Sequence, residues 1–166
     1  MADANPAPLA TPTDLNSNET RTVADALNSA LADCYTLYLK TKNFHWHVSG
    51  PHFRDYHLLL DDQAAQILGV TDAVAERVRK TGNVTLRSIG DIARRQTLQD
   101  NDKDFVPAPD MLIELREDNL KLVESFRAVK DAADAAKDNA TSGIVDEWTD
   151  QAEERAWFLF EASRKG

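Results

Sequence analysis

The fold is decided by residues 109–136, which read PDMLIELREDNLKLVESFRAVKDAADAA. Apolar side chains recur there at alternating intervals of three and four residues, and Asn119 fills the one gap in the series. The apolar members are Leu112, Leu115, Leu122, Phe126, Val129, Ala133 and Ala136. This alternation predicts one apolar stripe along an α-helix, and such a stripe is typical of the seam of a helix bundle.

Three further segments show helical periodicity. We expect helices from about residue 20 to the mid-40s, from Pro51 to about Lys80, and over about 141–164. Their predicted core positions are Val23, Leu27, Ala30, Cys34 and Leu37 in the first, Phe53, Leu60, Ala64, Ile67 and Val74 in the second, and Ile144, Trp148, Ala152, Ala156 and Leu159 in the last. The polar stretch 83–106 has room for a short helix near 89–96. The sequence therefore predicts an all-α four-helix bundle with a short extra helix in the crossover between helices two and three.

Composition limits the kinds of function that the chain can have. Its 166 residues suit one domain with its own core, and 28 acidic against 19 basic residues give a formal charge of −9. That charge argues against binding nucleic acid through the overall field and favours cationic partners such as metal ions. The single cysteine, Cys34, lies on an apolar stripe and reads as a small buried hydrophobe. Trp148, Trp157 and Phe158 read as core or interface aromatics.

The amino-terminal residues differ in composition from the rest of the chain. Three of the six prolines fall within residues 1–18, and no basic residue precedes Arg21. We expect a flexible, acidic, proline-rich arm over 1–18 and a bundle domain over 19–166. No stretch resembles a signal peptide, and no apolar run approaches the roughly 18 residues of a membrane span, so we expect a cytoplasmic protein with no membrane partner.

All four histidines lie between residues 45 and 57, close to acidic side chains. Imidazole and carboxylate together suit iron or zinc. On the second helix His57 and Asp61 are four residues apart and share a face, as do Asp72 and Glu76. Eleven residues separate Asp61 from Asp72, which is only about 20° past three full turns, so both pairs lie on one stripe.

The two pairs cannot share a metal within one chain, because eleven helical residues span about 16 Å. A two-fold dimer removes this difficulty. If the second helix packs antiparallel against its copy, His57 and Asp61 of one chain meet the second pair of the other, and two identical sites result. The usual Glu-x-x-His arrangement inside one bundle is absent, because no histidine lies beyond residue 57.

One set of residues resembles the ferroxidase signature of the Dps family, the miniferritins that protect DNA during starvation. The set is His45-Trp46, Gly50, Phe53, His57, Asp61, Asp72 and Ala75-Glu76-Arg77. The resemblance implies a ferritin-like bundle assembled from two-fold dimers into a hollow dodecamer. Such a cage takes iron and hydrogen peroxide or dioxygen as partners. It oxidises Fe(II), preferably with hydrogen peroxide, and stores ferric oxide, so that DNA and cell are protected from oxidative damage.

The same resemblance assigns roles to residues of this sequence. It implies a two-iron intersubunit site with His45, His57 and Asp61 from one subunit and with Asp72 and Glu76 from its two-fold mate. Trp46 would lie beside the iron and absorb stray oxidising equivalents. Iron would enter through an acidic pore near the start of the last helix, for which the candidates are Asp138, Asp146, Glu147 and Asp150.

Other interpretations remain open at this point. Relatives that condense DNA often use a lysine-rich terminal arm, whereas the first 20 residues here carry three acidic and no basic residues. We therefore expect direct DNA binding to be weak, and a DNA-binding, nucleoid-compacting cage is the alternative function. His45, His57 and Asp61 could instead form a mononuclear iron oxygenase site, which would leave the second carboxylate pair unexplained. A zinc scaffold would use His45, His47 and His52, although His47 and His52 read better as surface or loop residues.

Overall fold

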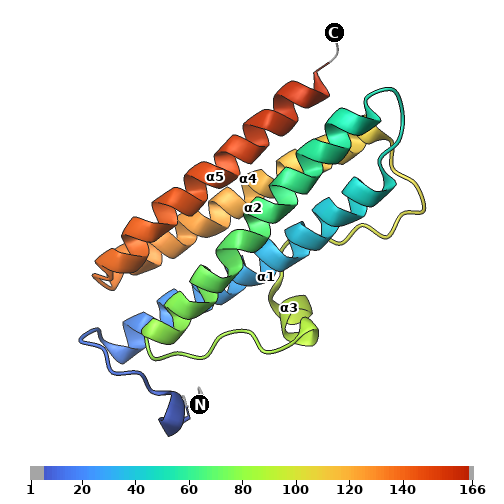
Figure 1. Ribbon diagram of the computed structural model, residues 1–166. Helices are drawn as coiled ribbons and strands as arrows, with labels where there is room; N and C mark the ends of the chain where they lie inside the picture. The colour runs from blue at the N-terminus through green and yellow to red at the C-terminus, as the bar shows by residue number, and fades with distance from the viewer. Residues whose placement is uncertain (1–5, 165–166) are drawn as a thin grey trace.

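The computed structural model describes residues 6–164, which form five α-helices and one short 3₁₀ turn and contain no β-strand (Figure 1). The elements are η1 (Ala7–Leu9), α1 (Ser17–His47), α2 (Phe53–Lys80), α3 (Ile89–Arg95), α4 (Ala108–Ala135) and α5 (Asn139–Ser163). The four long helices lie side by side, and short α3 lies against α1. The predicted all-α four-helix bundle with an extra helix in the crossover is confirmed. Within the described part of the chain, no helix is long and apolar enough to span a membrane.

The crossover between α2 and α4 carries the chain back along the bundle, so α2 and α4 run in one direction and α1 and α5 in the other (Figure 1). Polar contacts hold this crossover to α1. The buried Asp33 carboxylate accepts hydrogen bonds from the backbone N–H groups of Thr97 and Leu98, at 2.6 and 3.1 Å. The Asn28 side chain donates to the Val84 carbonyl at 3.0 Å. These hydrogen bonds therefore hold the long connection in a fixed position on α1.

Side-chain caps set where two of the long helices begin. The Asn16 side chain accepts a hydrogen bond from the Asn18 backbone N–H at 2.9 Å, so α1 begins at Ser17, a few residues earlier than predicted. Asp138 accepts from the Thr141 backbone N–H at 3.0 Å and caps α5 in the same way. Each cap satisfies an N–H group that the first helical turn leaves without a partner.

The α4 stripe faces the interior, and every apolar member of the predicted seam is buried. The polar gap at Asn119 is filled from α5, where Arg155 donates from Nε to the Asn119 amide oxygen at 2.8 Å. Burial lowers the pKa of the Arg155 guanidinium to about 10, which leaves it charged at neutral pH. This buried contact explains why the seam carries an asparagine at its centre.

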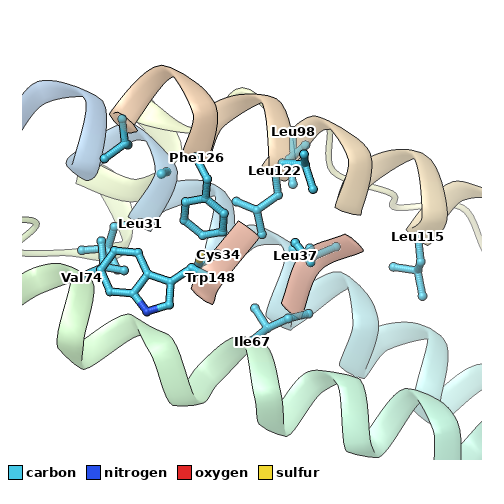
Figure 2. Packing of buried hydrophobic residues seen from close by; sticks show 14 of the residues in the cluster. Leu31, Cys34, Leu37, Ile67, Val74, Leu98, Leu115, Leu122, Phe126 and Trp148 are labelled. Carbon is cyan, nitrogen blue, oxygen red and sulfur yellow. The ribbon is translucent and has the colours of Figure 1, made fainter. Parts of the chain in front are cut away.

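Figure 2 shows the core around Phe126 of α4 and Trp148 of α5, whose ring centroids are 5.9 Å apart. Cys34 of α1 lies beside them and is fully buried, and burial raises the pKa of its thiol to about 12. A thiol in this environment stays protonated at neutral pH, so the prediction of a small buried hydrophobe is confirmed. Trp148 is a core aromatic, also as predicted.

Two predicted core positions are wrong. Phe53 is 44% exposed and Ile144 is 36% exposed. Phe53 is the first residue of α2, and Ile144 lies at the edge of the buried face of α5, where Val145 takes the core position. Trp157 and Phe158 are also exposed and pack edge to face on each other, so they are not core residues, and their role at an interface stays a prediction. The other core positions predicted on α1, α2 and α5 are all buried.

Part of the predicted amino-terminal arm lies against the carboxyl end of α2. Residues 1–5 of that arm lie outside the described residues, as do residues 165–166. Arg79 donates from Nη2 to the Leu9 carbonyl at 2.8 Å. Gly82 has φ +79°, and a Cβ there would lie 2.7 Å from the Thr11 carbonyl oxygen, so only glycine fits beside this segment. Residues 9–11 are therefore held against the bundle.

Replacing Asp33 with alanine tests how firmly the crossover is anchored. The change removes the acceptor of two backbone N–H groups, so we expect Asp33→Ala to lower the free energy of unfolding by about 2–4 kcal/mol. Urea unfolding followed by circular dichroism measures the change. The matched control is Asp131→Ala at an exposed position of α4, which should stay within about 0.5 kcal/mol of wild type. Equal stability of the two variants would contradict the anchoring role.

Candidate metal centre

The turn between α1 and α2 brings the predicted histidine ligands together. His45 lies in the last turn of α1, and His57 lies in the second turn of α2. Gly50 has φ +112° in the short connection between them, a conformation that side chains disfavour. This tight reversal lets the end of α1 face the beginning of α2.

The two imidazoles hold each other in place through the backbone. His45 Nδ1 lies 2.8 Å from the His57 carbonyl oxygen, and His57 Nδ1 lies 2.9 Å from the His45 carbonyl oxygen. The rings are stacked, with centroids 3.8 Å apart. Because a carbonyl can only accept, each Nδ1 carries a proton in this contact. This contact orients both rings and leaves Nε2 as the nitrogen with which either could bind a metal.

Asp61 adds a carboxylate to the histidine pair. Asp61 lies one helical turn after His57 on α2, and its Oδ1 is 3.8 Å from His45 Nε2. The Lys42 ammonium donates a hydrogen bond to the same oxygen at 2.7 Å. This hydrogen bond is the main reason that the pKa of Asp61 lies below its usual range. The carboxylate is therefore ionised at neutral pH. We refer to His45, His57 and Asp61 as the half-site.

Asp72 and Glu76 lie on α2, as His57 and Asp61 do, but they do not join the half-site. Both are exposed, and Glu76 forms an ion pair with Lys80 at 3.4 Å, one helical turn away. Helix α2 runs unbroken from Phe53 to Lys80, so the expected separation of about 16 Å between the two pairs applies. Within the described residues, no three histidine, cysteine or acidic side chains are grouped closely enough to hold a metal ion. A single chain therefore does not bring the five predicted ligands together.

The remaining predicted site residues lie on the surface around the half-site. Trp46 is 58% exposed, and its ring lies 5.8 Å from the Lys42 ammonium. His47 and His52 are exposed, and His47 Nδ1 lies 2.8 Å from the Asn43 carbonyl oxygen. Their exposure agrees with the prediction that both are surface residues.

Lys42 is a residue of this site that the sequence pattern did not single out. It lies three residues before His45 and four before Trp46, so the three side chains share one face of α1. That spacing was available in the sequence, but a lysine beside metal ligands reads as an ordinary exposed charge. Only the fold brings it within 2.7 Å of Asp61, which is 19 residues away along the chain.

The acidic residues near the start of α5 have different environments. Asp138 is buried, caps α5 and pairs with the Arg77 guanidinium at 2.9 Å, so its assignment to a metal-entry pore is wrong. Asp146 pairs with Lys130 at 2.8 Å. Glu147 and Asp150 are exposed. The reason for the error at Asp138 is that a capping carboxylate and a solvated one look alike in a sequence.

Comparison with known proteins identifies the family. A model of the ferritin-like domain matches residues 24–165. The DNA protection during starvation protein of Agrobacterium fabrum is 33% identical over 149 residues, which cover 90% of this chain and 92% of that protein. The chain belongs to the Dps family.

Solved Dps structures have the same fold. DpsC from Streptomyces coelicolor has a TM-score of 0.90 at 27% identity, covering 94% of this chain and 91% of that chain. The archaeal Dps homologue from Halobacterium salinarum has a TM-score of 0.89 at 26% identity, covering 100% of this chain and 94% of that chain. The ferritin-like character expected of the bundle is therefore confirmed.

Replacing Gly50 tests how the turn of this Dps chain supports the histidine pair. Gly50→Ala forces a side chain into a left-handed conformation, and we expect a loss of about 1–2 kcal/mol in the free energy of unfolding. The control is Gly143→Ala inside α5, where an added Cβ meets no atom within 4 Å. That change should stabilise the chain by up to about 1 kcal/mol. Thermal unfolding measures both, and shifts of the same sign would contradict this account.

Proposed function

We propose that the protein is a ferroxidase and iron-storage subunit that acts in the cytoplasm. Two chains pair across a two-fold axis, oxidise Fe(II) at two intersubunit sites, preferably with hydrogen peroxide, and store ferric oxide inside a dodecameric cage. The observation that carries the proposal is the reciprocal His45–His57 contact. It turns Nδ1 of both rings to the backbone, and His45 Nε2 faces Asp61 at 3.8 Å. Asp61 and His57 lie on the same α2 stripe as Asp72 and Glu76.

The ligand set suits both states of iron. Imidazole binds borderline Fe(II), and hard carboxylate oxygen suits the ferric product. Two ferrous ions held together can pass both electrons to one peroxide molecule, giving two ferric ions and, with two protons, two water molecules. No hydroxyl radical is then released. Exposed Trp46 lies at the half-site, where it would absorb stray oxidising equivalents.

The geometry of α2 supports antiparallel pairing. A two-fold axis that brings Asp61 of one chain near Asp72 of the other crosses α2 midway between them, close to Gln66 and Ile67. Leu68 lies on the stripe near that point and is exposed in the single chain, as is Ala65. An apolar centre flanked by ligand residues is what such a contact requires. In the pair, each half-site gains two carboxylates from its partner.

We propose that DNA is protected through removal of iron and peroxide rather than by coating. The Agrobacterium fabrum relative is named for DNA protection during starvation. In this chain residues 6–16 carry one acidic and no basic residue, and Arg79 holds Leu9 against the bundle. An acidic arm of this kind repels phosphate, so the alternative of a DNA-compacting cage has less support.

Iron oxidation by His57→Ala is the direct test of the proposed function. We expect assembled wild-type protein to oxidise Fe(II) rapidly with limiting peroxide and keep the ferric product soluble. Loss of a metal ligand should slow oxidation at least about tenfold. The control is His52→Ala, which removes an exposed imidazole outside the half-site and should match wild type. Absorbance of the ferric product measures the rates. Equal rates in all three proteins, or iron that precipitates as it does in buffer, would contradict the proposal.

A further inference from the structure

One buried cation of the bundle forms no ion pair within the described residues. Arg155 of α5 is 3% exposed, and its guanidinium donates from Nε to the neutral amide oxygen of Asn119 at 2.8 Å. Its Nη1 is buried and has no hydrogen-bond partner. Burial lowers the pKa of the guanidinium only to about 10, so the group stays charged at neutral pH.

The lack of a partner is unusual in this bundle. The other buried charges of the described residues are compensated: Lys40 pairs with Asp118, Asp138 pairs with Arg77, and Asp33 accepts hydrogen bonds from the crossover backbone. A buried charge without a partner is strongly unfavourable, because it has lost its water and gained nothing in return. The native chain is therefore stabilised by any anion that reaches Arg155.

A small cavity between α2 and α5 adjoins Arg155. Its volume is about 80 Å³, and Arg155 lines it together with Leu59, Asp62, Gln63, Gln66, Glu154 and Phe158. One buried water needs roughly 10–15 Å³ of such space, so the cavity has room for one small ion and some water. The side-chain amide of Gln66 offers a further N–H donor at this cavity.

The walls of the cavity favour an anion with a single charge. Leu59 and Phe158 give it an apolar side, where the attraction of a guanidinium is only weakly screened. Arg155 supplies one positive charge, so a divalent anion would keep one negative charge uncompensated. That charge would lie near Asp62 and Glu154, whose exposed carboxylates line the same cavity. Multivalent anions such as phosphate are therefore disfavoured.

We propose that the cavity between α2 and α5 is a binding site for a small monovalent anion such as chloride, held by the Arg155 guanidinium. The anion neutralises the buried charge and supplies the acceptor that Nη1 lacks. Because Arg155 also bonds to Asn119, the occupied site ties α2, α4 and α5 together. The site is independent of the proposed iron chemistry, since none of its residues is a proposed iron ligand.

The test is thermal unfolding of the assembled protein, followed by circular dichroism, as chloride replaces gluconate at constant ionic strength. Gluconate is monovalent but too large for the cavity. An anion that binds only the native state should raise the unfolding midpoint by about 3–5 °C for each tenfold increase in chloride above its Kd. Arg155→Met removes the charge and its donors and should abolish this dependence. The matched control, Arg127→Met, changes an exposed arginine of α4 and should keep it.

The wild-type protein decides the matter even if Arg155→Met fails to fold. A wild-type midpoint that chloride does not move would overturn the inference, because the guanidinium would then be satisfied by water or by a neighbouring chain. Loss of the dependence in Arg127→Met as well would show a general charge effect. Leu59→Trp fills the cavity and leaves Arg155 in place, so it too should lose the dependence. A full chloride response in folded Leu59→Trp or Arg155→Met would contradict this location.

Discussion

Four of the five ligands of the proposed iron site lie on one unbroken helix, and the rest of the structure depends on that constraint. Asp61 and Asp72 lie on the same stripe of α2, which runs from Phe53 to Lys80. A straight helix keeps them about 16 Å apart, far beyond the reach of a shared metal. Flexibility of the side chains cannot close that gap. A complete site of this composition therefore needs a second chain, and an antiparallel copy of α2 supplies the missing carboxylates.

The bundle provides the rigidity that such an arrangement requires. The half-site depends on the register between α1 and α2, because His45 and His57 bond to each other's backbone carbonyls. Polar contacts brace α1 from the other side, where the buried Lys40 ammonium pairs with Asp118 of α4 at 2.7 Å. Asp33 fixes the crossover to the same helix. Ligand positions on α1 are therefore set by contacts distributed along its whole length.

The fold followed from periodicity to a large extent. The apolar repeat on α4 identified the seam, and the apolar periodicity of α2 placed Leu60, Ala64, Ile67 and Val74 in the core. The errors at Phe53 and Ile144 lie at the edge of the core, since periodicity gives the direction of a side chain but not how far its neighbours cover it. The role of Asp33 in anchoring the crossover was not predictable, because an aspartate that accepts buried hydrogen bonds and one that faces solvent are the same residue type in a sequence.

The site residues were predictable where they share one helix. The contacts that the fold makes between residues of two different helices were not predictable. His57 with Asp61, and Asp72 with Glu76, follow from a spacing of four on α2. The contact of Lys42 with Asp61 joins α1 to α2 and depends on the turn at Gly50, so local spacing could not give it. Asp138 was misassigned for a similar reason, because its partner Arg77 lies on another helix.

The central claim, a site shared between two chains, is tested most directly by mixing two inactive variants. His57→Ala and Glu76→Ala chains damage opposite parts of the site, so each alone should oxidise Fe(II) with peroxide very slowly. In a mixed pair one site carries both defects and the other is intact. Random pairing in co-expressed cages should therefore restore about a quarter of the wild-type rate. Mixed cages as inactive as either variant alone would contradict a shared site. If every site took all its ligands from one chain, each site would still carry one of the two defects after mixing, and no activity would return.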